Sequence, residues 1–314
     1  MGKYIFGVDI GGTTVKLGLF DGGGGLLDKW EIPTAVVEHD DTAILRDVSA
    51  AIRAKQAEKG IAGEDVLGVG VGVPGPVLAD GTINRCVNLG WGVFNIEKTM
   101  SELCGFRVKA GNDANVAALG EQFRGGGRGY GNVVMITLGT GVGAGVVVDG
   151  RIVPGAFGAA GEVGHMHIND GETEMCGCGR QGCLEQYASA NGLVRVAERY
   201  LAAHPEVPTA LGRDVKVSSV TVFQQAQAGD RAGLAIVEKF FDTLGLALSY
   251  IACVIDPECV VIGGGVSNAG QYLIDGTARA YQKYCFHASK EMKVMRAQLG
   301  NDAGIYGACG MILR

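Results

Sequence analysis

Short apolar runs that end in glycine recur along the chain, and longer segments with apolar residues at helical spacing lie between them. The runs predict strands, whereas apolar positions three and four residues apart predict amphipathic helices. Strands are expected at residues 4–8, 17–20, 26–32, 66–73, 108–110, 133–138, 144–148 and 259–262. Helices are expected at 40–59, 113–123, 184–201, 231–254 and 304–313, with loops at 84–91 and 204–217. This mixture indicates an α/β fold.

A strand, a Gly-Thr turn and a second strand form a unit that occurs twice. The first turn is Gly11-Gly12-Thr13-Thr14, after Asp9, and the second is Gly139-Thr140-Gly141-Val142-Gly143. Glycines let backbone N–H groups approach a phosphate, threonine hydroxyls can donate to its oxygens, and Asp9 can hold Mg²⁺ directly or through water. Each turn alone is also compatible with an ordinary hairpin. The repetition favours two related lobes that face each other across a nucleotide.

A third glycine turn, Gly263-Gly264-Gly265, follows the strand expected at 259–262. Three glycines in a row let the backbone pass close to a flat ring or a phosphate. This turn is therefore a further candidate for contact with a nucleotide.

The segment 161–185 has the composition of a metal site. Cys176, Cys178 and Cys183 offer three sulfurs on a Gly-rich loop, and either His165 or His167 can complete a tetrahedral Cys3His zinc shell. Buried thiols or an incidental disulfide are the alternative, which the glycines among the cysteines disfavour. A closed shell of this kind is structural. The metal would bring together two carboxylates, Glu162 and Glu185, which suit a hydroxyl-rich ligand.

Asp113 stands at the start of the helix expected at 113–123. The helix dipole stabilises an ionised carboxylate at that end, so Asp113 can accept a hydroxyl proton at neutral pH. A simple helix cap is the alternative, since capping is the commonest use of such an aspartate.

Length and charge narrow the class of protein. The 314 residues predict two lobes, and 27 basic against 33 acidic residues, with no basic run, disfavour nucleic-acid binding. Nine cysteines are too few for a disulfide scaffold, which favours a reducing cytoplasm. The longest apolar segment, 244–255, is too short to span a bilayer, and the N-terminus lacks a signal-peptide pattern. We therefore expect no nucleic-acid or membrane partner.

Taken together, these motifs resemble the ROK family within the actin/hexokinase/Hsp70 ATPase superfamily, and most closely its zinc-containing bacterial glucokinases. The resemblance spans nearly the whole chain. It rests on DIGGTTVK (9–16), GNDAN (111–115), TLGTGVG (137–143), GEVGHM (161–166), CGCGRQGCLEQYAS (176–189) and IGGGVS (262–267). It implies a two-lobed actin-like, ribonuclease H-like α/β fold with nucleotide and sugar in the interlobe cleft. The implied lobes are 1–115 with 302–314, and 116–301.

The resemblance also implies roles for residues. Asp113 would be the catalytic base, and the sugar ligands would be Asn112, Glu162, His165 and Glu185. ATP and Mg²⁺ would bind at Asp9, Gly11, Gly12, Thr13, Thr14, Lys16, Thr137, Gly139, Thr140, Gly141, Gly263, Gly264 and Gly265. Structural Zn²⁺ would be held by His165, Cys176, Cys178 and Cys183, with His167 excluded.

The implied activity is ATP-dependent phosphorylation of the 6-hydroxyl of glucose. A kinase for another hexose or an N-acetylhexosamine is the alternative within the family. A non-catalytic sugar-sensing regulator would carry a DNA-binding helix-turn-helix ahead of the sugar domain, whereas here the first hairpin begins almost at Met1. The resemblance further implies a homodimer or homotetramer.

Overall fold

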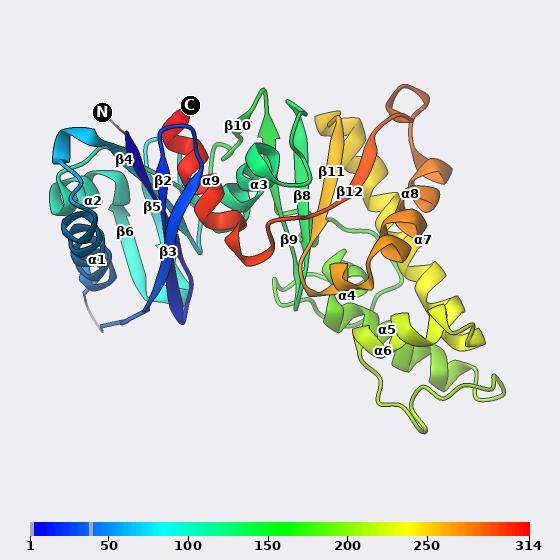
Figure 1. The fold of residues 1–314 in the computed structure, drawn as a ribbon. Helices are drawn as coiled ribbons and strands as arrows, with labels where there is room; N and C mark the ends of the chain where they lie inside the picture. The colour runs from blue at the N-terminus through cyan, green and yellow to red at the C-terminus, as the bar shows by residue number, and fades with distance from the viewer. Residues whose placement is uncertain (1–2, 38–39) are drawn as a thin grey trace. The chain divides into compact units, whose positions relative to one another are not determined.

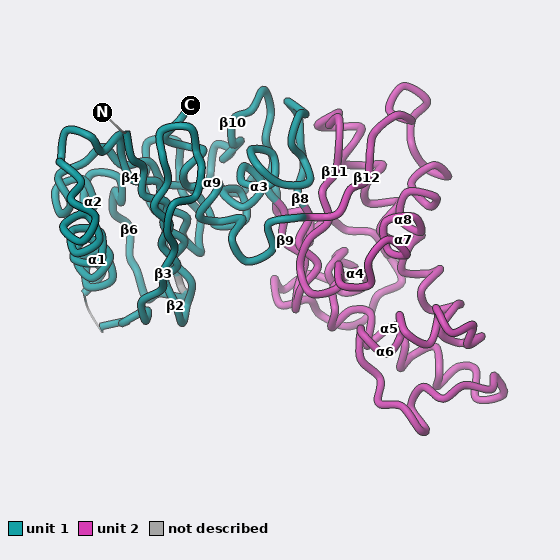
Figure 2. Tube along the Cα trace, viewed as in Figure 1, with its two compact units in different colours: residues 1–135, 145–161, 298–314 teal, residues 136–144, 162–297 magenta. Residues whose placement is uncertain are grey.

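The computed structural model describes residues 3–37 and 40–314 and has a mixed α/β architecture (Figure 1). The chain divides into two compact units (Figure 2). Unit 1 contains residues 1–135, 145–161 and 298–314, and unit 2 contains 136–144 and 162–297. Among the described residues, no helix combines the length and the apolar character needed to cross a membrane.

Unit 1 contains a five-stranded sheet with the order β3-β2-β1-β4-β7. β1 to β3 form an antiparallel meander, and β1, β4 and β7 run parallel. The elements of this unit are β1 (Tyr4–Ile10), β2 (Thr14–Asp21), β3 (Leu26–Pro33), α1 (Ala43–Lys59), β4 (Val66–Val73), β5 (Thr82–Cys86), β6 (Trp91–Asn95), α2 (Ile96–Cys104), β7 (Val108–Asn112), α3 (Asp113–Arg124), β10 (Arg151–Ile152) and α9 (Ala303–Leu313).

The alternating residues of β1 are buried on opposite faces of this sheet. Phe6 and Val8 belong to a core that α1 and α2 complete, whereas Ile5 packs with Ile305 and Cys309 of α9. Figure 1 shows α1 and α2 on one face and α9 on the other. A strand with both faces covered explains why β1 is an almost continuous apolar run.

Glycines let α9 approach its neighbours closely. A Cβ added to Gly70 of β4 would overlap the carbonyl oxygen of Ala308. On another side of α9, a Cβ added to Gly307 would overlap the carbonyl oxygen of Val116 in α3. The helix is therefore held at a distance that only glycine allows at these two positions.

A buried carboxylate fixes the segment that returns to unit 1. Glu121 of α3 is fully buried and accepts hydrogen bonds from the backbone N–H groups of Gly126 at 2.7 Å, Leu299 at 2.8 Å and Gln298 at 3.0 Å. These bonds satisfy the carboxylate in place of water. They also fix the entry to α9.

A second five-stranded sheet has the order β10-β9-β8-β11-β12, and the division between the units runs through β8 and β9. When the strands of each sheet are numbered along the chain, both sheets have the order 3-2-1-4-5. The remaining elements are β8 (Val133–Leu138), β9 (Val142–Val148), α4 (Glu185–Ala188), α5 (Ala190–Ala203), α6 (Ser219–Gln227), α7 (Arg231–Ile255), β11 (Cys259–Gly263), α8 (Gln271–Tyr284) and β12 (Lys293–Arg296).

Most expected elements are confirmed, and β4 and β8 match their predicted ranges. The prediction of a single helix at 184–201 is wrong. It is interrupted at Ser189, whose backbone is extended and whose hydroxyl caps α5 by accepting from the N–H of Gly192 at 2.9 Å. The loop expected at 84–91 is shorter in the structure, because residues 84–86 belong to β5 and Trp91 begins β6, and residues 87–90 connect these two strands of a hairpin.

The expected lobe boundary between residues 115 and 116 falls inside α3. In the structure α3 packs along α9 and stays with unit 1, which continues to residue 135. The chain returns to this unit at residues 145–161 and for the last time at residue 298. The glycine contact between α3 and α9 is the physical reason for this arrangement.

Candidate active site and metal centre

The first Gly-Thr turn lies at the tip of the β1–β2 hairpin. The N–H of Gly11 donates to the carbonyl of Thr14 at 3.0 Å, and the N–H of Thr34 donates to the carbonyl of Thr13 at 2.9 Å. Gly12 and Thr13 are exposed, and no described atom outside the turn lies within 4 Å of a Cβ added to Gly12. The fixed turn leaves backbone open to a ligand phosphate.

Asp9 is half-buried near the end of β1, between the buried residues Val8 and Ile10, and it lies directly opposite Lys16 on β2. A Cβ added to Gly304 would lie 2.5 Å from Cγ of Asp9, so the carboxylate occupies the space that the missing side chain leaves. Burial raises the pKa of Asp9 to about 6, Lys16 lowers it, and the charge of Asp113 raises it. A divalent cation here would compensate two neighbouring carboxylates.

Asp113 is the first residue of α3, and the cap of that helix is Asn112. The amide oxygen of Asn112 accepts from the N–H groups of Ala114 at 3.0 Å and Asn115 at 3.3 Å, and its Nδ2 donates to the carbonyl of Gly75 at 3.2 Å. The capping role considered for Asp113 therefore belongs to Asn112. Asp113 lies in the first turn, where the helix dipole favours its ionised form.

In unit 2, the second Gly-Thr turn lies against the segment expected to bind metal. The N–H of Gly139 donates to the carbonyl of Gly141 at 3.0 Å, and the carbonyl of Gly139 accepts from the N–H of Ala190 at 2.8 Å. A Cβ added to Gly141 would lie 2.7 Å from Oε2 of Glu185. A cavity of about 530 Å³ is lined by this turn, with Thr140, and by Cys176 and Glu185.

The triple-glycine turn lies beside the same Gly-Thr turn. Gly264 has a φ of 81°, and a Cβ there would lie 2.5 Å from the carbonyl oxygen of Leu138 at the end of β8. Thr137 donates from its hydroxyl to the carbonyl of Gly143 at 3.3 Å, which ties β8 to β9 beside the turn. The structure thus brings these two predicted nucleotide segments together.

A small cavity of about 180 Å³ lies between this triple-glycine turn and α6. Gly265 and Val266 line one side, and Phe223 and Gln224 of α6 line the other. Gly265 was predicted from the sequence, whereas α6 and its residues Phe223 and Gln224 were not. A signal was present, because Ser218 and Thr221 form a capping box at the start of the helix.

Four side chains of the segment 161–185 form a compact group. The ligand atoms of His165, Cys176, Cys178 and Cys183 all lie within 4.8 Å of one another. The sulfurs of Cys178 and Cys183 are 3.6 Å apart, and Nδ1 of His165 is 3.8 Å from the sulfur of Cys176. Sulfurs that share a tetrahedral zinc ion at about 2.3 Å lie about 3.8 Å apart, whereas a disulfide needs about 2.05 Å. The spacing fits a shared ion.

His167 makes different contacts. Its Nδ1 is 2.9 Å from the carbonyl of Gln181, and its Nε2 is 2.8 Å from Oδ1 of Asp170. The hydrogen bond to Asp170 raises the pKa of His167. Both ring nitrogens are thus engaged outside the Cys3His group, which selects His165 among the two histidines that spacing alone left open.

The two glutamates predicted to bind sugar lie on either side of His165. Oε1 of Glu185 is 3.7 Å from Nδ1, on the cysteine side, and Oε2 of Glu162 is 4.0 Å from Nε2. Glu185 also accepts from the thiol of Cys176 at 2.9 Å. The metal group, His165 and both carboxylates therefore form one cluster in unit 2, while Asp9, Asn112 and Asp113 lie in unit 1.

The family model described as ROK family matches residues 5–314. The chain belongs to the ROK family. This ROK protein is 38% identical over 310 residues to a glucokinase from Halalkalibacterium halodurans, an alignment that covers 97% of this chain and 93% of the relative. It is 30% identical to an N-acetyl-D-glucosamine kinase from Erwinia tasmaniensis over 98% of this chain and 99% of that one.

Among solved structures, the ROK protein is similar to a ROK family glucokinase from Streptomyces griseus in complex with glucose and AMPPNP. The TM-score is 0.71 with 32% identity, and the match covers 98% of each chain. The expected actin-like α/β fold is thereby confirmed.

A buried carboxylate within the segment 161–185 of the ROK protein was not foreseen. The side chain of Glu172 has no exposed surface, and it pairs with Arg195 at 2.9 Å and Arg199 at 3.0 Å. The hydroxyl of Tyr187 donates to it at 2.5 Å. These partners, Arg199 foremost, hold the pKa of Glu172 well below its usual range. The sequence does contain a signal for this cluster. Arg195 and Arg199 lie one turn apart on α5, and they pair with Glu172 and Glu174.

Replacing Glu172 with glutamine is expected to lower the free energy of unfolding on the order of 3 kcal/mol at pH 7, because two arginines lose a buried counter-charge. The folded pKa lies below the unfolded value, so this stabilisation is present at neutral pH. It declines progressively once the pH falls below the unfolded value of about 4.3 and is fully lost only below the much lower folded pKa, so the difference between the two proteins should narrow from pH 7 to pH 3.5 without vanishing. Urea unfolding followed by circular dichroism at pH 7 and pH 3.5 measures both effects.

Glu198→Gln is the matched control, because Glu198 is an exposed residue of α5, the helix that carries Arg195 and Arg199. Its free energy of unfolding should stay within about 0.5 kcal/mol of wild type. Equal destabilisation of the two variants would show that the buried ion pairs of Glu172 contribute no more to stability than an exposed carboxylate does.

Proposed function

We propose that this protein is an ATP-dependent glucokinase that phosphorylates the 6-hydroxyl of glucose. The observation that carries the proposal is the carboxylate pair of unit 1. Asp113 lies in the first turn of α3, and its charge acts on Asp9 beside the Gly-Thr turn. A base for a hydroxyl proton and a carboxylate for Mg²⁺ are the two acidic groups that phosphoryl transfer requires.

In this proposal Asp113 accepts the proton of the 6-hydroxyl as the sugar oxygen attacks the γ-phosphorus of ATP. The bond from that phosphorus to the bridging oxygen breaks, and ADP leaves. Mg²⁺, held at Asp9, would neutralise charge on the phosphates. The turns at 11–14 and 139–141 would donate backbone N–H groups, and Lys16 and Thr137 would support them. The cavity between Gly265 and α6 would receive the adenosine end of the nucleotide.

The sugar hydroxyls would be bound by Asn112, Glu162, His165 and Glu185. Nε2 of His165 faces Glu162 rather than the cysteines, so it is the nitrogen available to a sugar oxygen. Nδ1 faces Cys176 and would bind the metal. One imidazole would thus connect a structural ion to the substrate.

A panel of hexoses and N-acetylhexosamines with ATP tests the assignment. We expect the highest kcat/KM for glucose, with hexose 6-phosphate and ADP formed in equal amounts. A higher kcat/KM for N-acetylglucosamine, the substrate named for one relative, would replace glucose as the assigned substrate. Absence of phosphorylation with every sugar would refute the kinase.

We propose that the ion held by the Cys3His group is Zn²⁺. Cys178→Ser is expected to remove one equivalent of zinc and to raise the KM for glucose, because the loop that carries Glu185 loses its anchor. Elemental analysis and steady-state kinetics measure the two effects. Cys253→Ser, at an exposed cysteine outside the group, should keep both values. Zinc content equal to wild type in Cys178→Ser would refute the site.

We also propose a cytoplasmic location and a homodimer or homotetramer, in line with the free cysteines and with the family. Light scattering coupled to size-exclusion chromatography tests the assembly. A mass of 32.5 kDa would identify a monomer and refute it.

A further inference from the structure

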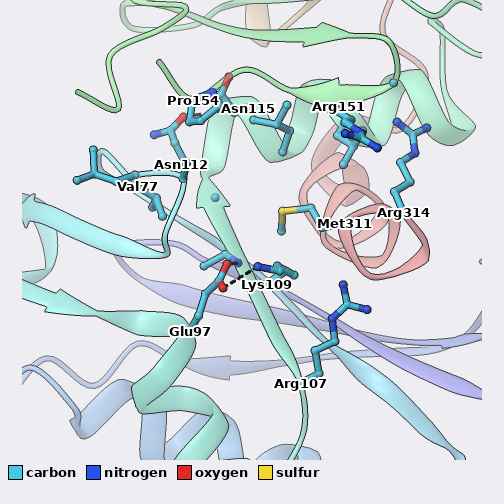
Figure 3. A pocket seen from close by; sticks show the side chains of 17 residues that line it. Val77, Glu97, Arg107, Lys109, Asn112, Asn115, Arg151, Pro154, Met311 and Arg314 are labelled. Carbon is cyan, nitrogen blue, oxygen red and sulfur yellow. Dashed lines mark hydrogen bonds and ion pairs between the residues drawn. The ribbon is translucent and has the colours of Figure 1, made fainter. Parts of the chain in front are cut away.

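A cavity of about 570 Å³ lies within unit 1, over the strand β7 (Figure 3). We call it the β7 pocket. Its walls come from β7, the β9–β10 turn and the C-terminal end of α9, and residues 77–79 close one side. None of the residues predicted to bind nucleotide or metal lines it, and of the predicted sugar ligands it reaches Asn112.

Cationic side chains dominate the β7 pocket. Arg107, Lys109, Arg151 and Arg314 line it, against a single carboxylate side chain, Glu97. Glu97 is already engaged, because it accepts from Nζ of Lys109 at 2.9 Å and from the N–H of Ala110 at 3.0 Å. Three guanidinium groups therefore remain in excess, in a protein whose net charge is −6.

Arg314 is held in place at the rim. Its guanidinium hydrogen-bonds the amide oxygen of Gln122, and a Cβ added to Gly150 would lie 2.9 Å from its Nη1. Arg314 is exposed overall, and partial desolvation of its guanidinium lowers its pKa. Among the described residues this guanidinium pairs with a neutral amide, so a bound anion would supply a counter-charge.

Part of the lining of the pocket is apolar. Leu119, Ile152 and Met311 line it beside the arginines, and Figure 3 shows Met311 between the side chains of Lys109 and Arg314. An inorganic anion alone would leave this surface in contact with water. A ligand with an apolar body and an anionic end matches both parts of the lining.

We propose that the β7 pocket binds a small organic phosphate. Its phosphate would meet Arg107, Arg151 and Arg314, since guanidinium groups donate paired N–H groups to phosphate oxygens. Its carbon body would cover Ile152 and Met311. The ligand would lie beside Asn112, which caps the helix that begins with Asp113. The proposal does not depend on kinase activity, because it is tested by binding.

Calorimetric titration of the full chain with phenyl phosphate at low ionic strength tests the site. The double variant Arg107→Gln/Arg151→Gln removes two charges from exposed positions and should fold normally. In this double variant we expect the Kd for phenyl phosphate to rise by about tenfold or more for each charge removed. Arg128→Gln is the matched control, since Arg128 is exposed in unit 1 and does not line the pocket. It should bind phenyl phosphate as wild type does.

Inorganic phosphate and phenol correspond to the two parts of phenyl phosphate, and each is titrated separately. Weaker binding of phosphate than of phenyl phosphate, with no binding of phenol, supports the proposal. Equal affinity in wild type and the double variant would place the probe elsewhere, such as at the Gly-Thr turns, and would overturn it. Absence of binding to wild type at millimolar concentration, or equal affinity for inorganic phosphate, would also overturn it.

Discussion

Asp113→Asn is expected to lower kcat for glucose phosphorylation by about 10²- to 10⁴-fold, because an amide cannot accept the hydroxyl proton. The fold should be retained, since the cap of α3 is Asn112 and not Asp113. The KM for glucose should change only a few-fold, because the substitution preserves size and hydrogen-bonding atoms. A coupled assay for ADP gives both constants.

Asp47→Asn is the control for this variant, as Asp47 is an exposed aspartate of α1 in the same unit. Its kcat should equal that of wild type. Retention of wild-type kcat in Asp113→Asn would show that another group accepts the proton. A rise in KM alone would make Asp113 a binding residue instead of a base.

Gly307→Ala is expected to lower the free energy of unfolding by about 3 kcal/mol, the upper end of the usual range for overpacking. The added methyl group meets the backbone carbonyl of Val116, which cannot rotate away as a side chain would. Alanine favours a helix over glycine by about 1 kcal/mol, and this gain offsets only part of the loss.

Tryptophan fluorescence during urea unfolding measures the effect, because both tryptophans, Trp30 and Trp91, belong to unit 1. Gly63→Ala is the matched control, since no described atom lies within 4 Å of a Cβ added to Gly63. Its unfolding midpoint should stay near that of wild type. Equal midpoints for Gly307→Ala and wild type would mean that α3 and α9 separate readily.

Features encoded by neighbouring residues could be predicted. The turns at 11–14 and 139–141 and the strands β4 and β8 are of this kind, because glycine and the apolar runs act locally. The three cysteines also lie within eight residues. These parts of the candidate site could be predicted because their residues lie close together in the sequence.

Features that depend on distant partners could not be predicted. Spacing left His165 and His167 equivalent, and the contact of Nδ1 of His167 with the carbonyl of Gln181, 14 residues along the chain, helps to distinguish them. The extension of unit 1 to residue 135 follows from the packing of α3 on α9, whose residues are far apart in sequence. A single chain gives no local signal for such a contact.

The position of α9 sets an order of events during synthesis. Residues 162–297 leave the ribosome before α9 does, so unit 2 can acquire its structure while one face of the first sheet still lacks its cover. During that interval Ile5 and Phe20 are without their partners on α9. Uncovered apolar surface of this kind promotes aggregation. The segment translated first is thus among the last to be completed.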